Sequence, residues 1–126
     1  MRGIGSLTAI SLLFLAIGCG TGSNPRQLQS ITLTSSPAGD AVQFVATGHY
    51  NQPPPTLSPL PALWAVYLTG GQIGPTITQN GLAQCAAGAP GTFSIIVEAP
   101  TDPGIPISQI ESANSLVVTW TTLTCP

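Results

Sequence analysis

Charge is what this chain lacks most. Its 126 residues include two basic side chains, Arg2 and Arg26, against four acidic ones and one histidine. A protein that binds nucleic acid needs a basic surface to neutralise phosphates, so this class is excluded. A polybasic membrane patch is excluded on the same ground. Charged helix formers are equally scarce, whereas Val, Ile, Thr, Gly and Pro are plentiful, and this balance predicts an all-β fold.

Residues for catalysis are also few. His49, the only histidine, ends a predicted strand beside a proline-rich segment, where it is either a solvated surface side chain or a general base. Asp40 and Asp102 stand in turn signals, where carboxylates cap backbone N–H groups. The glycine pairs lack the lysine of a phosphate-binding loop. We therefore predict no catalytic residue, no metal and no cofactor; hydrolytic turnover that is lost on His49→Ala would contradict this.

Residues 1–18 have the pattern of a cleavable leader. A short basic start, Met1-Arg2, precedes an uncharged apolar run over residues 4–17, which falls short of the roughly 20 residues that a membrane-spanning helix needs. The run ends in Ala16-Ile17-Gly18-Cys19, which resembles the lipobox of bacterial lipoproteins, although Ala16 stands where leucine is commonest. The alternative is an ordinary secretory signal that is cut near Gly20 or Gly22. Both alternatives predict an exported protein.

The lipobox resemblance implies that Cys19 is acylated and becomes the first mature residue. Its acyl chains would anchor the protein in membrane lipid, because two chains suffice for stable attachment. Gly20 stands where an aspartate would retain a lipoprotein in the inner membrane, so the implied location is the cell envelope, and the outer membrane in a diderm host. Residues 19–27 then read as the lipidated cysteine and a flexible tether, and residues 28–126 as one domain.

The two remaining cysteines, Cys85 and Cys125, form an even pair in an exported chain, where disulfides persist. We predict that they are bonded. Closing a loop of about 40 residues stabilises a fold by roughly 4 kcal/mol on the chain-entropy estimate. A redox or metal-binding role is disfavoured because the chain has no Cys-x-x-Cys and no histidine close to either cysteine in the sequence.

Short alternating runs between turn signals predict six or seven strands. The predicted strands cover residues 29–34, 41–48, 63–68, 75–79, 82–85, 92–99 and 116–125, and Asn80-Gly81 suits a tight hairpin turn. The turn signal Ser36-Pro37-Ala38-Gly39-Asp40 separates the first two, and residues 101–114 form a long connection before the last. Alternation places four side chains in the predicted core, and these are Phe44, Trp64, Val66 and Ile95.

The order of several short motifs resembles the bacterial immunoglobulin-like domain family, group 2. These motifs are Gln43-Phe44 with Ala46-Thr47-Gly48, then Leu63-Trp64, then Asn80-Gly81-Leu82, then Gly91-Thr92-Phe93. The resemblance covers roughly residues 28–125, with a proline-rich insert before the tryptophan as a departure. It implies an immunoglobulin-like antiparallel β-sandwich of about seven strands with Greek-key connections and Trp64 between the sheets.

The segment over residues 49–61, HYNQPPPTLSPLP, is predicted to be a loop or an edge, with its prolines extended in polyproline II. It is either a rigid connector that protects a sheet edge or a contact loop, whose candidate residues are Tyr50, Pro53, Pro54, Pro55 and Leu57.

The resemblance implies a non-enzymatic, membrane-anchored module with a structural, adhesive or protein-contact role. Its partners would be membrane lipid and envelope proteins. The alternative is a module that binds carbohydrate or cell-wall material through exposed aromatic side chains such as Tyr50, Tyr67 and Trp120.

Overall fold

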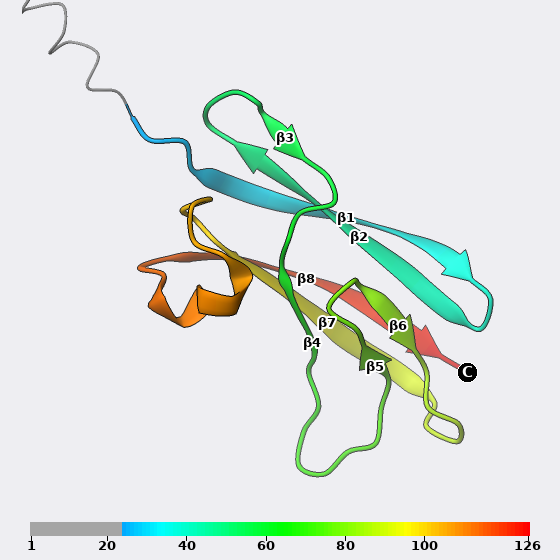
Figure 1. Cartoon of the computed structure of the whole chain (residues 1–126). Coiled ribbons are helices and arrows are strands. Elements are labelled where there is room, and N and C mark those ends of the chain that lie inside the picture. The colour runs from blue at the N-terminus through cyan, green and yellow to red at the C-terminus, as the bar shows by residue number, and fades with distance from the viewer. Residues whose placement is uncertain (1–23) are drawn as a thin grey trace, which may run out of the picture.

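A computed structural model describes residues 24–126, which fold into two antiparallel β-sheets packed face to face (Figure 1). Cys19, the leader and most of the predicted tether lie outside the described residues. The described residues contain no helix with the length and apolar character needed to cross a membrane.

The two sheets follow the strand order of a constant-type immunoglobulin domain, with one strand added. The larger sheet has the order β1-β2-β6-β5, with the short β3 paired to β2, and the smaller sheet has the order β4-β7-β8. The strands are β1 (Leu28–Ala38), β2 (Ala41–Tyr50), β3 (Thr56–Leu57), β4 (Leu63–Val66), β5 (Thr76–Ile77), β6 (Leu82–Gln84), β7 (Gly91–Pro100) and β8 (Leu116–Cys125). The predicted all-β sandwich is thus confirmed, with eight strands in place of six or seven.

Strand β1 is longer than the sequence predicted. It continues through Ser36, Pro37 and Ala38, which pair with β2, and only Gly39-Asp40 makes the turn. Pro37 is tolerated because β1 is an edge strand, where a missing N–H need not break a ladder. The glycine makes the sharp reversal possible, with φ at +65°.

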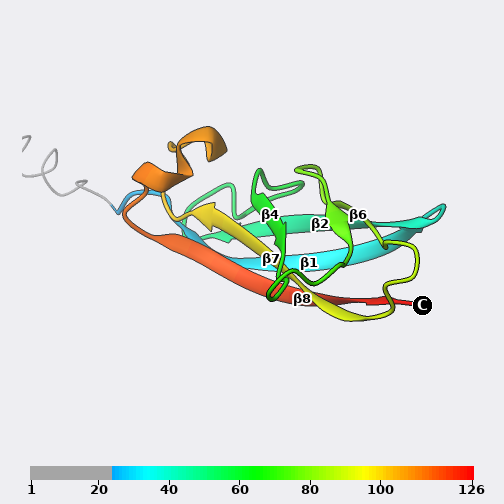
Figure 2. The ribbon, with the colours of Figure 1, turned by 90° about the horizontal axis from the view of Figure 1, so that it is seen from below.

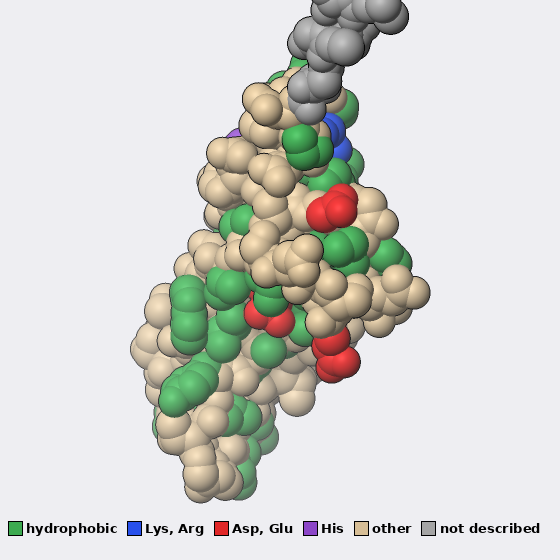
Figure 3. All heavy atoms as spheres, turned by 90° about the vertical axis from the view of Figure 1, so that its left-hand side faces the viewer, with side chains coloured by type: hydrophobic (Ala, Val, Ile, Leu, Met, Phe, Trp, Pro, Cys, Tyr) green, Lys and Arg blue, Asp and Glu red, His purple; other side chains and the backbone are tan. Residues whose placement is uncertain are grey.

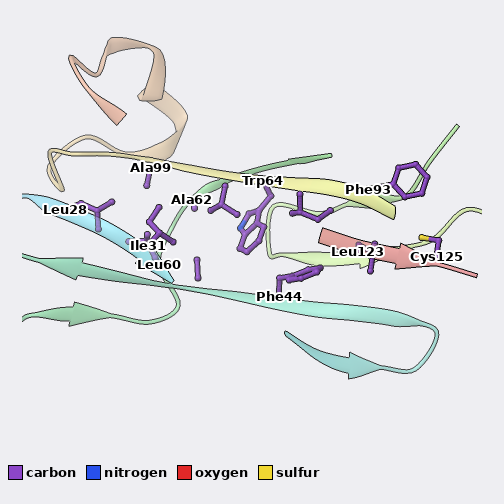
Figure 4. Packing of buried hydrophobic residues seen from close by; sticks show 14 residues of the cluster. Leu28, Ile31, Phe44, Leu60, Ala62, Trp64, Phe93, Ala99, Leu123 and Cys125 are labelled. Atoms are coloured by element: carbon purple, nitrogen blue, oxygen red, sulfur yellow. The ribbon is translucent and has the colours of Figure 1, made fainter. Parts of the chain in front are cut away.

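The core lies between the sheets, and side chains of period two supply it (Figure 4). Phe44, Trp64 and Ile95 are buried, and Val66 packs against them while partly exposed, so the predicted core set is confirmed. The Phe44 and Trp64 rings, which come from opposite sheets, have centroids 6.3 Å apart. Trp64 therefore lies between the sheets, as the resemblance implied.

The disulfide between Cys85 and Cys125 is present, with their Cα atoms 5.7 Å apart. Cys85 directly follows β6 in the larger sheet and Cys125 ends β8 in the smaller one. The bridge thus ties the two sheets together where the last strand would otherwise fray.

The long connection from β7 to β8 carries the 3-10 helix η2 (Ile107–Ser112). It lies at the same end of the sandwich as Leu28, whose N–H donates to the carbonyl of Thr101 (2.9 Å). The N-terminal end of the described residues lies at this end of the sandwich, opposite the C-terminus (Figure 1).

Candidate functional site

Three of the family-like motifs, those at Gln43-Phe44, at Trp64 and at Asn80-Gly81, meet in space between β2 and β4. Gln43 donates from its side-chain amide to the carbonyls of Phe44 (2.9 Å) and Asn80 (2.8 Å). Gln79 accepts from the N–H of Trp64 (3.2 Å) and donates to its carbonyl (3.1 Å). This side chain occupies the place of a neighbouring strand beside β4, and it satisfies backbone groups that an edge would leave open.

Gly81 completes this arrangement because only a glycine fits there. Its φ is +83°, its carbonyl accepts from the N–H of Phe44 (2.8 Å), and a Cβ would overlap the carbonyl oxygen of Phe44. Asn80, in contrast, has a negative φ, so Gly81 alone supplies the left-handed conformation in the turn between β5 and β6. The motif residues thus hold the two sheets together. Their polar side chains already make hydrogen bonds within the fold and are not free to bind a ligand.

A groove of about 440 Å³ borders this arrangement, lined by β2 and by residues 59–61, 64, 79 and 80. None of its lining side chains titrates, and its two glutamines are already hydrogen-bonded to the backbone. The groove therefore offers no acid, base or nucleophile to a substrate.

The proline-rich segment folds back on itself rather than extending as polyproline II. The N–H of Tyr50 donates to the carbonyl of Pro55 (2.8 Å), and β3 then pairs with β2 through Gly48 and Leu57. The predicted extended conformation is wrong because strand pairing draws the prolines into a hairpin loop. Pro53, Pro54, Pro55 and Leu57 are exposed, as a contact loop requires.

Tyr50 is less available than its neighbours because Arg26 covers it. The guanidinium carbon lies 3.7 Å from the centre of the ring, and the same group donates to the carbonyl of Pro54 (2.9 Å). Asn51 accepts from the N–H of Gln27 (2.7 Å). Residues 26 and 27, which the sequence placed in the tether, are therefore held against this loop, and the only basic residue of the described range is used for this contact.

The outer face of the smaller sheet carries the largest group of exposed apolar side chains that share one surface. Strand register puts alternate residues of β4, β7 and β8 on this side. We use "outer face" for its central residues, which are Leu63, Ala65, Tyr67, Ile96, Glu98, Val118 and Trp120; Glu98, the one charged side chain among them, lies between Leu63 and Val118. Figure 3 looks onto this side and shows hydrophobic side chains gathered in the lower half of the view.

Two aromatic rings form the centre of the outer face. Tyr67 and Trp120 have ring centroids 6.4 Å apart with planes inclined at 57°, and each is more than half exposed, at 54% and 56%. They lie on either side of β7, where Trp120 pairs with Ile96 and the carbonyl of Ser94 accepts from the N–H of Tyr67 (2.9 Å). Exposed pairs of this kind are enriched where proteins bind partners. The structure thus brings Tyr67 and Trp120 together and leaves Tyr50 at the other end of the sandwich.

The titratable side chains of the described residues form no metal-binding cluster, although Arg26, Tyr50 and Asp102 line one pocket near η2. No group of three or more His, Cys, Asp or Glu within residues 24–126 has the spacing of a metal site, and no polar or charged side chain in that range is buried. His49 bonds through Nε2 to the hydroxyl of Thr32 (2.9 Å) on the outside of the β1–β2 pair. Asp102 accepts from the N–H of Gly104 (2.8 Å), which is the turn role that the sequence predicted.

Comparisons with models of known families, with curated proteins and with solved structures gave no match to this chain. The likeness to the group 2 immunoglobulin-like family thus remains a prediction from its motif residues. The sequence reasoning named Tyr67 and Trp120 only as separate candidates. The two rings lie together because of the register of β4, β7 and β8. Alternation within a single strand does not indicate which residues of other strands are its neighbours.

Proposed function

We propose that this protein is a non-enzymatic, lipid-anchored module of the bacterial cell envelope that works by surface contact. The outer face carries this proposal, because an exposed Tyr67–Trp120 pair lies on it beside further apolar side chains, with Glu98 as the one charged side chain among its central residues. Aromatic side chains contribute large contact areas at little conformational cost, which is why they dominate binding energy at interfaces. Among residues 24–126 no polar or charged side chain is buried, and this favours a contact role over a catalytic one.

The leader pattern and Cys19 support anchoring. Pro25 is tied to the domain through the side chain of Asn51, and the five residues from Gly20 to Asn24 can span at most about 17 Å. A domain on so short a spacer stays next to its membrane, with the proline-rich loop and η2 at the anchored end. The outer face would then lie along the side of the domain.

Two measurements test the proposal. The wild-type protein should partition into detergent, and a Cys19→Ala form should stay in the aqueous phase. Residues 20–126, immobilised on beads, should retain envelope components, and Trp120→Ser should abolish this retention. Ile73→Ser is the matched control, because Ile73 is even more exposed (72%) but lies outside the outer face. Equal retention by both variants would contradict a contact role for the outer face.

A second candidate function is the binding of neutral carbohydrate, and the aromatic pair favours this too. Sugar rings stack on exposed aromatic faces, and the hydroxyls of Ser94 and Thr122 lie on the same side of the sheet as the two rings. Glycan-array binding that disappears with Tyr67→Ala or Trp120→Ala, and survives Tyr50→Ala, would favour this candidate.

A further inference from the structure

Strand β8 is an open sheet edge of unusual length. The smaller sheet has the order β4-β7-β8 and ends with it, and Figure 2 shows β8 in red below β1. Its ten residues contain no charge and no proline. Natural edge strands commonly carry lysine, proline or a bulge that prevents pairing with another chain, and β8 has none of these.

The register shows which backbone groups of β8 point away from β7. The N–H of Thr101 donates to the carbonyl of Ser115 (3.0 Å), and the same register continues without a shift along the whole β7–β8 pair. Odd-numbered residues of β8 therefore bond to β7, because successive residues of a strand direct their polar groups to opposite sides. The even-numbered residues, among them Val118, Trp120 and Thr122, direct theirs to the open edge.

These even-numbered residues also place their side chains on the outer face. Leu116, Val118 and Trp120 are 40%, 46% and 56% exposed. A strand added at this edge would satisfy the free backbone groups and cover the same apolar side chains. The edge is also rigid, because the disulfide at Cys125 holds the end of β8 to the other sheet, and little conformational entropy is lost on pairing.

We propose that the outer edge of β8 pairs with β8 of a second copy of this chain, in antiparallel orientation, to give a six-stranded sheet across the dimer. This inference rests on the proposed contact role of the outer face and names its partner. The edge is self-complementary in two respects. No charges oppose each other, and a pairing centred on Thr119 puts Val118 of each copy opposite Trp120 of the other.

We expect the dimer to be weak, because its contact area is small. Three exposed side chains and one strand edge offer less than the roughly 800 Å² per partner of a standard interface. We expect half-association at tens to hundreds of micromolar. Antiparallel pairing sets the two Leu28 ends at opposite ends of the strand pair.

Sedimentation equilibrium of residues 20–126 tests this, because both sheets, the core and the disulfide lie within residues 24–126. The wild-type polypeptide should associate to a dimer as its concentration rises. Val118→Lys should weaken the dimer at least about tenfold, because it puts a charged side chain opposite Trp120 of the other copy, beside Glu98 of its own β7. Thr122→Pro should do the same, since it removes an N–H that points to the open edge and none that bonds to β7.

Ile73→Lys is the matched control for the added charge and should leave the dimer unchanged. Circular dichroism should show the same β spectrum for all four proteins, and Val118→Lys alone suffices if Thr122→Pro fails to fold. A wild-type polypeptide that stays monomeric at about 1 mM would overturn the inference. A dimer that is equally stable in Val118→Lys would also overturn it. If the polypeptide is monomeric but Trp120→Ser still abolishes envelope retention, self-pairing fails and the contact role stands.

Discussion

Gly81→Ala is the substitution that most sharply tests how the two sheets are locked. Gly81 has a φ of +83°, and a Cβ there would overlap the carbonyl oxygen of Phe44 and come within 3.1 Å of Cζ2 of Trp64. The alanine therefore meets two separate penalties. One is the left-handed backbone conformation, and the other is the collision with β2 and the core tryptophan.

The size of the effect follows from adding the two penalties. A left-handed conformation costs an L-residue about 1–2 kcal/mol, and overpacking of a dense core costs about 1–3 kcal/mol. We expect a loss of about 3 kcal/mol in the free energy of unfolding, which is a large part of the stability of a domain of this size. For about 100 residues this lowers Tm by roughly 12–20 °C.

Gly39→Ala is the matched control, because Gly39 has a similar φ of +65° and nothing within 4 Å of its would-be Cβ. It should lose only about 1 kcal/mol, the conformational part. Thermal and urea unfolding of residues 20–126, followed by circular dichroism, measure both. Equal destabilisation by Gly81→Ala and Gly39→Ala would show that the close approach of Gly81 to Phe44 and Trp64 does not constrain the fold.

Three further predictions concern the contacts around the core. Replacing Cys85 and Cys125 together with alanine should lower the free energy of unfolding by roughly 4 kcal/mol, measured in urea, because a loop of 40 residues is no longer closed. Gln79→Ala should cost about 1–2 kcal/mol by the same assay, because it leaves a backbone N–H and carbonyl of β4 without their partners. Arg26→Ala should speed hydrogen exchange at the Tyr50 amide, because the loop that receives this hydrogen bond loses its brace.

Each of these three predictions has its own control measurement. Gln84→Ala changes another exposed glutamine, one on β6, and should change the stability by less than about 0.5 kcal/mol. Free-thiol titration of the unfolded, unreduced residues 20–126 should find no thiol, and two thiols would contradict the bridge. Exchange at Ile95, in the core of β7, should not respond to Arg26→Ala. A general increase at all amides would mean that Arg26 supports the whole domain and not the loop.

Much of the fold could be predicted because its signals are local. Phe44, Trp64 and Ile95 alternate with polar neighbours, and alternation alone fixes which face of a strand is buried. The bond between Cys85 and Cys125 followed from counting cysteines in a chain that is predicted to be exported. The bounds of β8 were also predicted correctly, because a connection rich in turn residues precedes that strand.

What the sequence could not provide depends on pairing between strands. The signals at Pro37 indicate a turn, and only the partner strand shows that the chain stays extended there. The prolines at 53–55 favour an extended segment by themselves, and pairing of β3 with β2 overrides this preference. The Tyr67–Trp120 pair and the open edge of β8 likewise exist only once three strands have their register. Both candidate contact features thus arise from tertiary structure.

The central claim is that an exported, lipid-anchored chain carries a sandwich closed by one disulfide. Intact mass of the protein, extracted with detergent from the cells that make it, tests this most directly. We predict a chain that begins at Cys19, carries added acyl mass, and is two hydrogens lighter than the sequence because Cys85 and Cys125 are joined. A chain that still begins at Met1, with three free thiols and no lipid, would contradict the account.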